Sequence, residues 1–207
     1  MIQEFKNFGY FIHDISWREL QSVRDEIKET DGLEDYGEKV DGHVDKTFKL
    51  STSVKDLETL VMPYFIEYDK QYNFFKHIIP SIGYQELKAD LVMNDAWVSF
   101  QNKHEFNPAH THPGLLSFVI WLDIPYDRPS EIRHSPGKSK NNKSGSFTLY
   151  YTNSLGSVET ENILLDNTFN NKIIIFPAGL KHSVQPFYST DKQRVSVAGN
   201  LYIQGKG

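Results

Sequence analysis

Two histidines one residue apart are the first feature of this chain that could do chemistry. His110 and His112 lie in the stretch NPAHTHPGLLSFVIWLDIP, directly before an apolar run. On an extended chain, residues i and i+2 point to the same side, so two imidazoles here could bind one metal ion. A polar turn that enters a strand would explain the same pair. The two histidines alone do not decide between these interpretations.

A third histidine follows a second apolar run. His182 comes after KIIIFPAGLK, and alone it would be an ordinary turn residue. With His110 and His112 it would give three protein ligands with open positions, which is what a catalytic iron needs to bind substrate and oxygen. The chain contains no cysteine, so any metal site must use His, Asp or Glu side chains.

A polar face on a third segment offers a site for an anion. In RVSVAGNLYI, the period of two places Arg194, Ser196 and Asn200 on one face and apolar residues on the other. Arg194 provides a planar fork for a carboxylate, and Ser196 adds a hydroxyl beside it. A half-exposed strand with one wet face is the alternative. In AWVSFQ, Gln101 alternates in the same way and could bind the same ligand.

Helices are predicted only before these segments. The first covers SWRELQSVRDEIKE, where Ser16 and Glu19 have the spacing of a capping box and the apolar residues share one face. The second begins at Ser53, where Ser53 and Asp56 repeat the cap signal, and continues to about residue 78, with Pro63 predicted to kink or interrupt it. Residues 31–49 between the helices are polar and contain glycine, so a loop is expected there.

Short β-rich runs begin at about residue 84. They are ELKADLV, AWVSFQ, LLSFVIWLDI, SFTLYY, KIIIFP and RVSVAGNLYI. Several short strands with no helical pattern between them favour an antiparallel sandwich or barrel. Residues 126–146 form the longest break, which predicts either a functional lid or a disordered insertion. We expect a single domain over 1–207, with a helical part at 1–83 packed on a β core at 84–207.

Composition limits the remaining possibilities. A chain of 207 residues with 39% hydrophobic and 14% aromatic residues predicts one folded globular domain. The formal net charge of -5 gives no reason to expect nucleic-acid binding through bulk charge. No apolar run reaches the roughly 18 residues that a membrane span needs, and the N-terminus lacks an apolar signal core. A cytoplasmic location is expected, whereas the oligomeric state cannot be predicted.

In order along the chain, the segments HTHPGLLSFVIWL, FPAGLKHSVQPF and RVSVAGNL resemble the iron(II)- and 2-oxoglutarate-dependent oxygenases. The resemblance covers about Trp97 to Tyr202, and it is closest to the small, prolyl-hydroxylase-like oxygenases of phages and marine bacteria. It implies a mainly β fold with N-terminal helices around a double-stranded β-helix, the jelly-roll or cupin-like core. It also implies Fe(II) as cofactor, 2-oxoglutarate as small-molecule cosubstrate, and O2.

The activity implied by this resemblance is that of a dioxygenase that hydroxylates an unidentified substrate and releases succinate and CO2. A peptide or protein side chain is the favoured substrate class. A phage-encoded chain would work in the host cytoplasm. The basic residues between Arg128 and Lys143 could prefer acidic partners, or could simply belong to a solvated loop.

The resemblance assigns roles by position. His110 matches the first metal ligand, His182 the distal histidine, and Arg194 the basic residue that pairs with the distal carboxylate of 2-oxoglutarate. Ser196 matches the serine of an Arg-x-Ser arrangement. Two further residues, Gln101 and Asn200, are candidates for hydrogen bonds to the cosubstrate.

His112 departs from the family pattern, which usually has a carboxylate at this position. His112 could itself be a ligand, a carboxylate such as Glu105 or Asp123 could complete the set, or the site could be altered and inactive. The first interpretation is the simplest, because the position and direction of the side chain already match. Three neutral histidines would leave iron(II) one positive charge more than two histidines and a carboxylate, which suits a dianionic cosubstrate.

Two other functions are compatible with the same residues. One is a cupin-like metalloenzyme with three histidines and no 2-oxoglutarate, which has no fixed need for the arginine fork of Arg194. The other is a non-catalytic β-sandwich binding module, in which the histidines need not converge.

Overall fold

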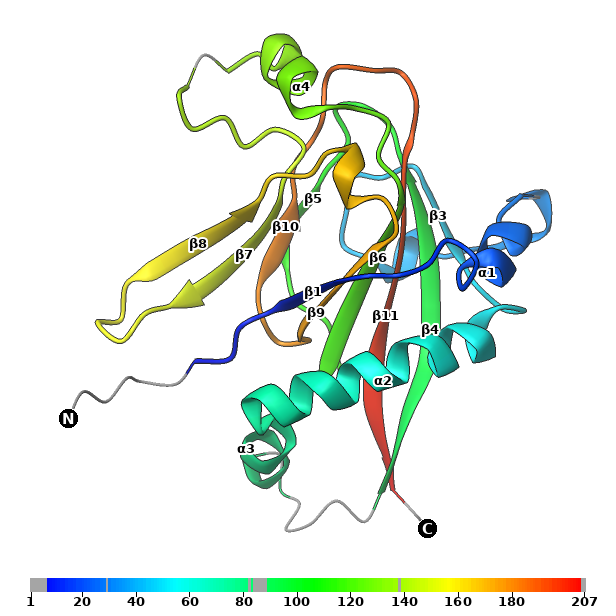
Figure 1. Cartoon of the computed structure of the whole chain (residues 1–207), viewed down its shortest axis with the longest axis vertical. Helices are drawn as coiled ribbons and strands as arrows, with labels where there is room; N and C mark the ends of the chain where they lie inside the picture. Colours follow the sequence, from blue (N-terminus) through cyan, green and yellow to red (C-terminus); the bar gives the residue numbers. More distant parts are fainter. Residues whose placement is uncertain (1–6, 29, 82, 84–88, 138, 206–207) are drawn as a thin grey trace.

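Two antiparallel sheets face each other in the computed structural model, which describes residues 7–28, 30–81, 83, 89–137 and 139–205 (Figure 1). The large sheet contains, in spatial order, β1 (Phe11–Asp14), β9 (Lys172–Pro177), β6 (Leu116–Asp123), β11 (Arg194–Gly205), β4 (Ala89–Gln101), β3 (Lys46–Lys49) and β2 (Glu34–Asp35). The small sheet contains β5 (Asn107–His110), β10 (His182–Val184), β7 (Phe147–Thr152) and β8 (Val158–Ile163). The predicted mainly β architecture with a jelly-roll core is confirmed.

The central strands of the large sheet are covered on both faces. Phe118 of β6 packs against Phe65 of a helix, with ring centroids 6.1 Å apart, whereas Trp121 of the same strand packs inward against Phe147 of β7. Such two-sided burial explains why β6 is an almost unbroken apolar run. Alternate residues of one strand therefore serve two different cores, and only the inner face can carry a site between the sheets.

Helices cover the outer face of the large sheet. They are α1 (Gln21–Glu26), α2 (Val54–Tyr72) and α3 (Phe74–Ser81), and Figure 1 shows α2 running across β6, β11 and β4. The helix continues through Pro63, where an interruption was one of the two predicted outcomes. It ends instead at Asn73, whose positive φ of 49° is a conformation that asparagine tolerates better than most residues.

Glu26 provides the cap of α2, where the sequence predicts that Ser53 does so. Its carboxylate accepts hydrogen bonds from the backbone N–H groups of Ser51, Thr52 and Ser53 and from the Ser53 hydroxyl. Burial raises the pKa of Glu26, but these hydrogen bonds outweigh it and lower the pKa to about 2. The local cap signal was misleading because a residue from another helix reaches the same N–H groups.

The N-terminal part differs from its predicted form in two places. The first helix begins at Gln21 instead of Ser16, because the Ser16–Glu19 pair closes a turn in which Glu19 accepts the Ser16 N–H. Residues 31–49, expected to be a loop, contain two short 3-10 helices at Thr30–Gly32 and Gly37–Lys39 as well as β2 and β3. Strands this short and polar give no alternation that a sequence pattern can detect.

The long break at residues 126–146 contains ordered structure, so the disordered insertion, one of its two predicted interpretations, was wrong. It contains α4 (Arg128–His134), capped by Asp127, whose side chain accepts the Ser130 N–H. The buried carboxylate of Glu131 accepts the backbone N–H groups of Tyr188 and Ser189. These bonds hold α4 against the segment between β10 and β11, and a helix of two turns is too short to give a clear periodic signal.

The predicted β-rich runs form strands wherever the structure describes them, but the prediction missed several observed strands that are short or polar. The runs ELKADLV and AWVSFQ belong to one strand, β4, although residues 86–88 of the first run lie outside the described residues. The strands β5, β8 and β10 were not predicted, because they are short or polar and owe their pairing to neighbouring strands. The division into parts at 1–83 and 84–207 stays a prediction.

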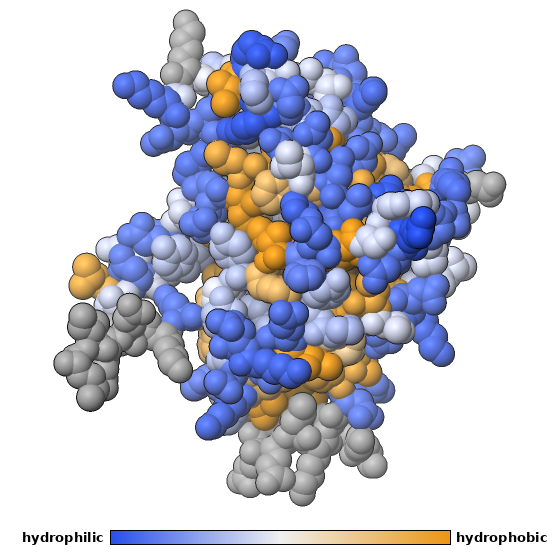
Figure 2. Space-filling view, viewed as in Figure 1, coloured by the Kyte–Doolittle hydropathy of each residue, from blue (hydrophilic) through white to orange (hydrophobic). Residues whose placement is uncertain are grey.

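Polar residues dominate the surface seen in Figure 2, where apolar residues appear in a broken band down the middle of the face. Leu155 and Val158, at the turn between β7 and β8, are the most exposed large apolar side chains among the described residues. No helix in the described part of the chain has the length and apolar character needed to cross a membrane.

Candidate metal and cosubstrate site

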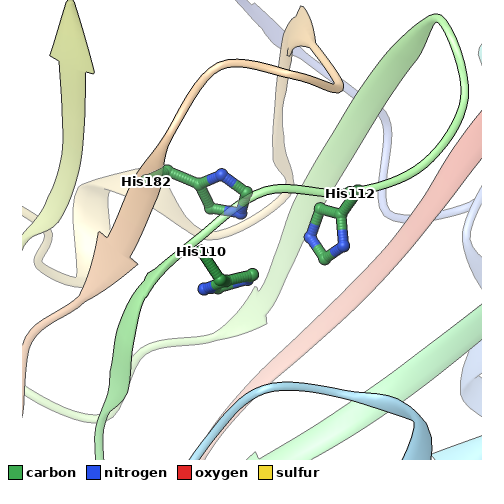
Figure 3. A group of neighbouring side chains, drawn as sticks. All are labelled: His110, His112 and His182. Atoms are coloured by element: carbon green, nitrogen blue, oxygen red, sulfur yellow. The ribbon is translucent and has the colours of Figure 1, made fainter.

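His110, His112 and His182 converge between the two sheets (Figure 3). One potential ligand nitrogen from each ring lies within 4.8 Å of the other two, and the ring centroids are 4.3–4.9 Å apart. The register of β5 with β10 places His110 directly opposite His182, and His112 lies two residues after the end of β5. Strand pairing thus brings together histidines that are distant in the sequence.

Backbone carbonyls fix the tautomers of two of these histidines. Nδ1 of His110 lies 2.8 Å from the carbonyl oxygen of Pro108, and Nδ1 of His182 lies 3.0 Å from that of Leu180. Because a carbonyl oxygen only accepts hydrogen bonds, both Nδ1 atoms must carry the proton and donate it. Each Nε2 is then left with a lone pair for a metal, which is the usual arrangement around histidine ligands.

Two of the histidines are also kept neutral. Burial, together with the neighbouring His110, lowers the pKa of His182 to about 3 and that of His112 to about 4. Both rings therefore stay unprotonated at physiological pH. Since only the neutral imidazole can coordinate a metal, these two rings can bind a divalent cation without first releasing protons.

No carboxylate joins the three histidines within the part of the chain that the structure describes. Glu105, one of the two candidates, caps the turn before β5 and accepts hydrogen bonds from both the backbone and the side-chain amide of Asn102. Asp123, the other candidate, is an exposed residue at the end of β6. The geometry therefore favours a set of three histidines over a set completed by either of these carboxylates.

A pocket between the sheets extends from the histidines to Arg194. Its cavity volume is about 50 Å³. The inner faces of β4 and β11 contribute Gln101, Ser196 and Arg194 to its wall, as the alternation in the sequence predicts. Asn200 lies further along the same face and is not part of this wall. Its amide oxygen accepts the Ser117 hydroxyl at 2.6 Å.

Arg194 is buried, with 2% of its surface exposed. It lies at the end of the pocket away from the histidines, because its partner Gln101 is four residues further along β4 than Trp97, which contacts His112. Its guanidinium donates to Gln101 Oε1 from two nitrogens, at 3.1 and 2.5 Å. It also donates to the Tyr126 hydroxyl at 2.8 Å and to the carbonyl oxygens of Gly145 and Gln185. Gln101 approaches from the pocket wall, whereas Tyr126, Gly145 and Gln185 are not pocket-lining residues.

Tyr126 and Gly145 were not identified from the sequence, since both belong to the break that looked structureless. Gly145 has a positive φ of 69°, and a Cβ atom there would lie 2.8 Å from the Tyr126 hydroxyl. Glycine is therefore needed for the carbonyl to reach Arg194 while Tyr126 packs beside it. A glycine within a polar loop is too common a signal for this role to be read from the sequence.

The surroundings of Arg194 leave its charge without an ionised partner. Among the described residues, no carboxylate lies within ion-pair distance of this guanidinium, and every hydrogen-bond acceptor around it is neutral. A buried cation is costly unless an anion pairs with it. A wall that presents this cation at one end and three histidines at the other matches a metal ion together with an anionic organic ligand.

Comparison with known families identifies the origin of this arrangement. A family model described as "Putative 2OG-Fe(II) oxygenase" matches residues 95–200, just over half of the chain. The chain belongs to this family. The matched region contains the three histidines and Arg194, and the oxygenase uses Fe(II), 2-oxoglutarate and O2. This membership decides against the non-catalytic binding module and against a cupin-like enzyme without 2-oxoglutarate.

Solved structures support the fold of this oxygenase. A prolyl-4-hydroxylase from Pseudomonas putida is 12% identical, with a TM-score of 0.55 over 97% of this chain and 94% of that one. A viral collagen prolyl hydroxylase from Paramecium Bursaria Chlorella virus-1, solved with 2-oxoglutarate, is 13% identical, with a TM-score of 0.51 over 95% and 96%. No curated protein sequence matches the chain. At these identities the likeness establishes the fold alone.

Proposed function

We propose that His110, His112 and His182 are the metal ligands of this oxygenase. The convergence of their nitrogens in a buried site, with no carboxylate in the group among the described residues, carries this proposal. Two tautomers held by backbone carbonyls and two lowered pKa values support it, because each leaves a neutral lone pair ready for iron.

Arg194 binds the distal carboxylate of 2-oxoglutarate, and Gln101 and Ser196 contact the cosubstrate from the same wall. The buried guanidinium supports this role, since its partners among the described residues are all neutral. Gln101 would share or release Arg194 when the carboxylate arrives, because it accepts two of the guanidinium hydrogen bonds on the pocket side. Asn200 stabilises the strand through Ser117 instead of contacting the cosubstrate.

The protein residues hold, orient and shield the reactants. When bound, iron and 2-oxoglutarate supply the oxidising power for hydroxylation, with succinate and CO2 as products. Trp97, Trp121 and Phe147 line the pocket and would exclude water from the reacting groups. The histidines would fix the metal, while Arg194 would determine how far from it the cosubstrate extends.

A peptide or protein side chain is the substrate class that we propose. The fold likeness to two prolyl hydroxylases over nearly the whole chain supports this choice. The test is incubation with a library of short peptides, followed by mass spectrometry for the gain of one oxygen atom that depends on 2-oxoglutarate. Turnover of small metabolites without any peptide hydroxylation would contradict it. A cytoplasmic location also stays a prediction.

The role of Arg194 has a direct test. In Arg194→Ala, affinity for 2-oxoglutarate should fall by about 100-fold, because a buried hydrogen-bonded charge loses its partner. Affinity for iron(II) should stay unchanged, since the histidines are untouched. Anaerobic titration followed through the visible charge-transfer band of the iron–2-oxoglutarate complex measures the first quantity, and iron(II) binding alone measures the second. Arg133→Ala, at an exposed arginine of α4, is the matched control. Equal loss of both affinities would contradict this role.

A further inference from the structure

A line of aromatic side chains leads away from the three histidines towards the surface. Trp97 of β4 lines the pocket and contacts His112, with ring centroids 5.4 Å apart. Tyr36, which follows β2, stacks on Trp97, with ring centroids 5.8 Å apart and an angle of 27° between the ring planes. Trp97 is 7% exposed, whereas Tyr36 is only half-buried. The two rings thus connect the wall of the site with solvent.

A carboxylate completes this line. The Tyr36 hydroxyl donates to Asp95 Oδ2 at 2.8 Å. Burial and this carboxylate raise the pKa of Tyr36 above its ordinary value, so the phenol keeps its proton at rest. The strand register aligns Ala96 with Gly199 and Met93 with Leu201, so Asn94 and Asp95 together oppose Asn200. Such a β-bulge redirects side chains, and here it accompanies the contact between Asp95 and Tyr36.

Indole and phenol are the most easily oxidised side chains in a protein without cysteine, apart from methionine. A phenol that loses an electron also loses its proton, so it needs a base within hydrogen-bond distance. The indole of Trp97 contacts a histidine of the site, and the phenol of Tyr36 stacks on this indole. The carboxylate of Asp95 accepts a hydrogen bond from the phenol and can serve as its base. Packing alone requires none of these chemical properties.

We propose that Trp97 and Tyr36 form a redox relay that carries oxidising equivalents out of the site when no substrate consumes them. The proposal rests on the proposed function, because the histidines must hold the redox-active metal. Its role is protective, since a strong oxidant confined among aromatic walls would otherwise modify them.

The relay balances in electrons and protons. Trp97 gives one electron to the oxidised metal centre, then Tyr36 gives one electron to Trp97 and its phenolic proton to Asp95. A soluble one-electron reductant such as ascorbate returns an electron to Tyr36, and Asp95 returns the proton. Two passes consume the two oxidising equivalents left by one decarboxylation. The remaining oxygen atom of O2 then leaves as water with two protons from solvent.

Trp121 provides an internal comparison. It also lines the pocket, but the aromatic contacts described for it are to Phe147 and Phe169, at 6.0 and 5.6 Å. Phenylalanine is far harder to oxidise than tyrosine and has no proton to release. A radical formed on Trp121 would therefore have no comparable exit, so the relay is confined to the Trp97 side of the site.

The test is freeze-quench electron paramagnetic resonance of the iron(II)-loaded chain without primary substrate, followed by mass spectrometric mapping of oxidised residues. One arm uses 2-oxoglutarate with O2, and the second uses hydrogen peroxide instead. Both arms should give a tyrosyl radical in the native chain. Tyr36→Phe should abolish this signal and increase oxygen insertion at Trp97. Tyr64→Phe, at a tyrosine of α2 remote from the site, should change neither result.

Two further variants guard against misfolding of Tyr36→Phe. Trp97→Phe keeps a ring in place but interrupts the relay, and Asp95→Asn removes the base, so each should lower the radical yield. Succinate formed at the native rate with no Tyr36-dependent radical in either arm would overturn the relay. A failure of the proposed cosubstrate site looks different. Succinate would then be absent from the first arm, while iron(II) held by the histidines would still give the Tyr36 radical with peroxide.

Discussion

The histidine end and the arginine end of the pocket are both buried and polar, but they are held in place in different ways. His110 and His182 each donate to a carbonyl two residues earlier in the chain. Arg194 instead depends on Gln101, Tyr126, Gly145 and Gln185, which come from four separate segments. One end is therefore organised locally and by a single strand pairing, whereas the other requires the assembled fold.

The two ends of the pocket also differ in charge. Burial lowers the pKa values of His112 and His182, so these two rings carry no charge at physiological pH. The arginine end carries a permanent positive charge, and its hydrogen-bond partners in the described part of the chain are all neutral. The pocket thus separates a site for a metal from a site for an anion. A ligand that spans both must present its chelating group at one end and its free carboxylate at the other.

Loss of a histidine should have the largest effect on ligand affinity. This effect should be confined to the histidine end of the pocket. In His182→Ala or His112→Ala, iron(II) affinity should fall by more than about 100-fold, because even changes around metal ligands cost 10- to 100-fold. Anaerobic metal titration and succinate formation measure the loss. The control is His134→Ala, at an exposed histidine of α4. Unchanged iron affinity in His112→Ala would mean that His112 is not a ligand.

Tyr126→Phe should act on the arginine end alone. It removes the hydroxyl that accepts from Arg194 and donates to Gly145, so affinity for 2-oxoglutarate should fall by about 10-fold. Iron(II) affinity should not change. Titration of the two ligands separately checks both expectations, with Tyr151→Phe at an exposed tyrosine as the control. If both affinities fell together, the two ends would not be independent.

Glu26→Gln should leave both ends intact and lower only the stability of the fold. We expect a loss of about 1 kcal/mol at pH 7, after allowance for the solvent screening of a partly exposed carboxylate. The pKa of Glu26 is about 2 in the folded chain, below the value of about 4.3 typical of unfolded chains. Its contribution is therefore complete above the unfolded value and is lost as the pH falls from about 4 towards 2.

Urea denaturation of the native chain and Glu26→Gln at pH 7 and pH 3 measures this effect. The difference in unfolding free energy between the two should narrow at the lower pH. Glu67→Gln, at an exposed glutamate of α2, should show neither the loss nor the narrowing. A difference that does not depend on pH would show that the lost packing, and not the charge, explains the effect.

Features that depend on neighbouring residues were predictable from the sequence. The alternation in β11 correctly separates Arg194 and Ser196 from the apolar face, and the spacing of His110 and His112 correctly predicts that they point to one side. Both follow from the period of a strand, which is a local property of the backbone. The order of these segments also sufficed to recognise the oxygenase family, because short motifs survive where overall identity is low.

Only the tertiary structure decided the rest. It placed His182 opposite His110 and left Glu105 and Asp123 outside the histidine group. It also formed the helix α4 within the segment from 126 to 146, where a long break was expected. It also stacked Tyr36 on Trp97 across two strands. These outcomes depend on pairing between residues far apart in the chain. Such pairing is determined by the packing of the whole domain and not by any local pattern.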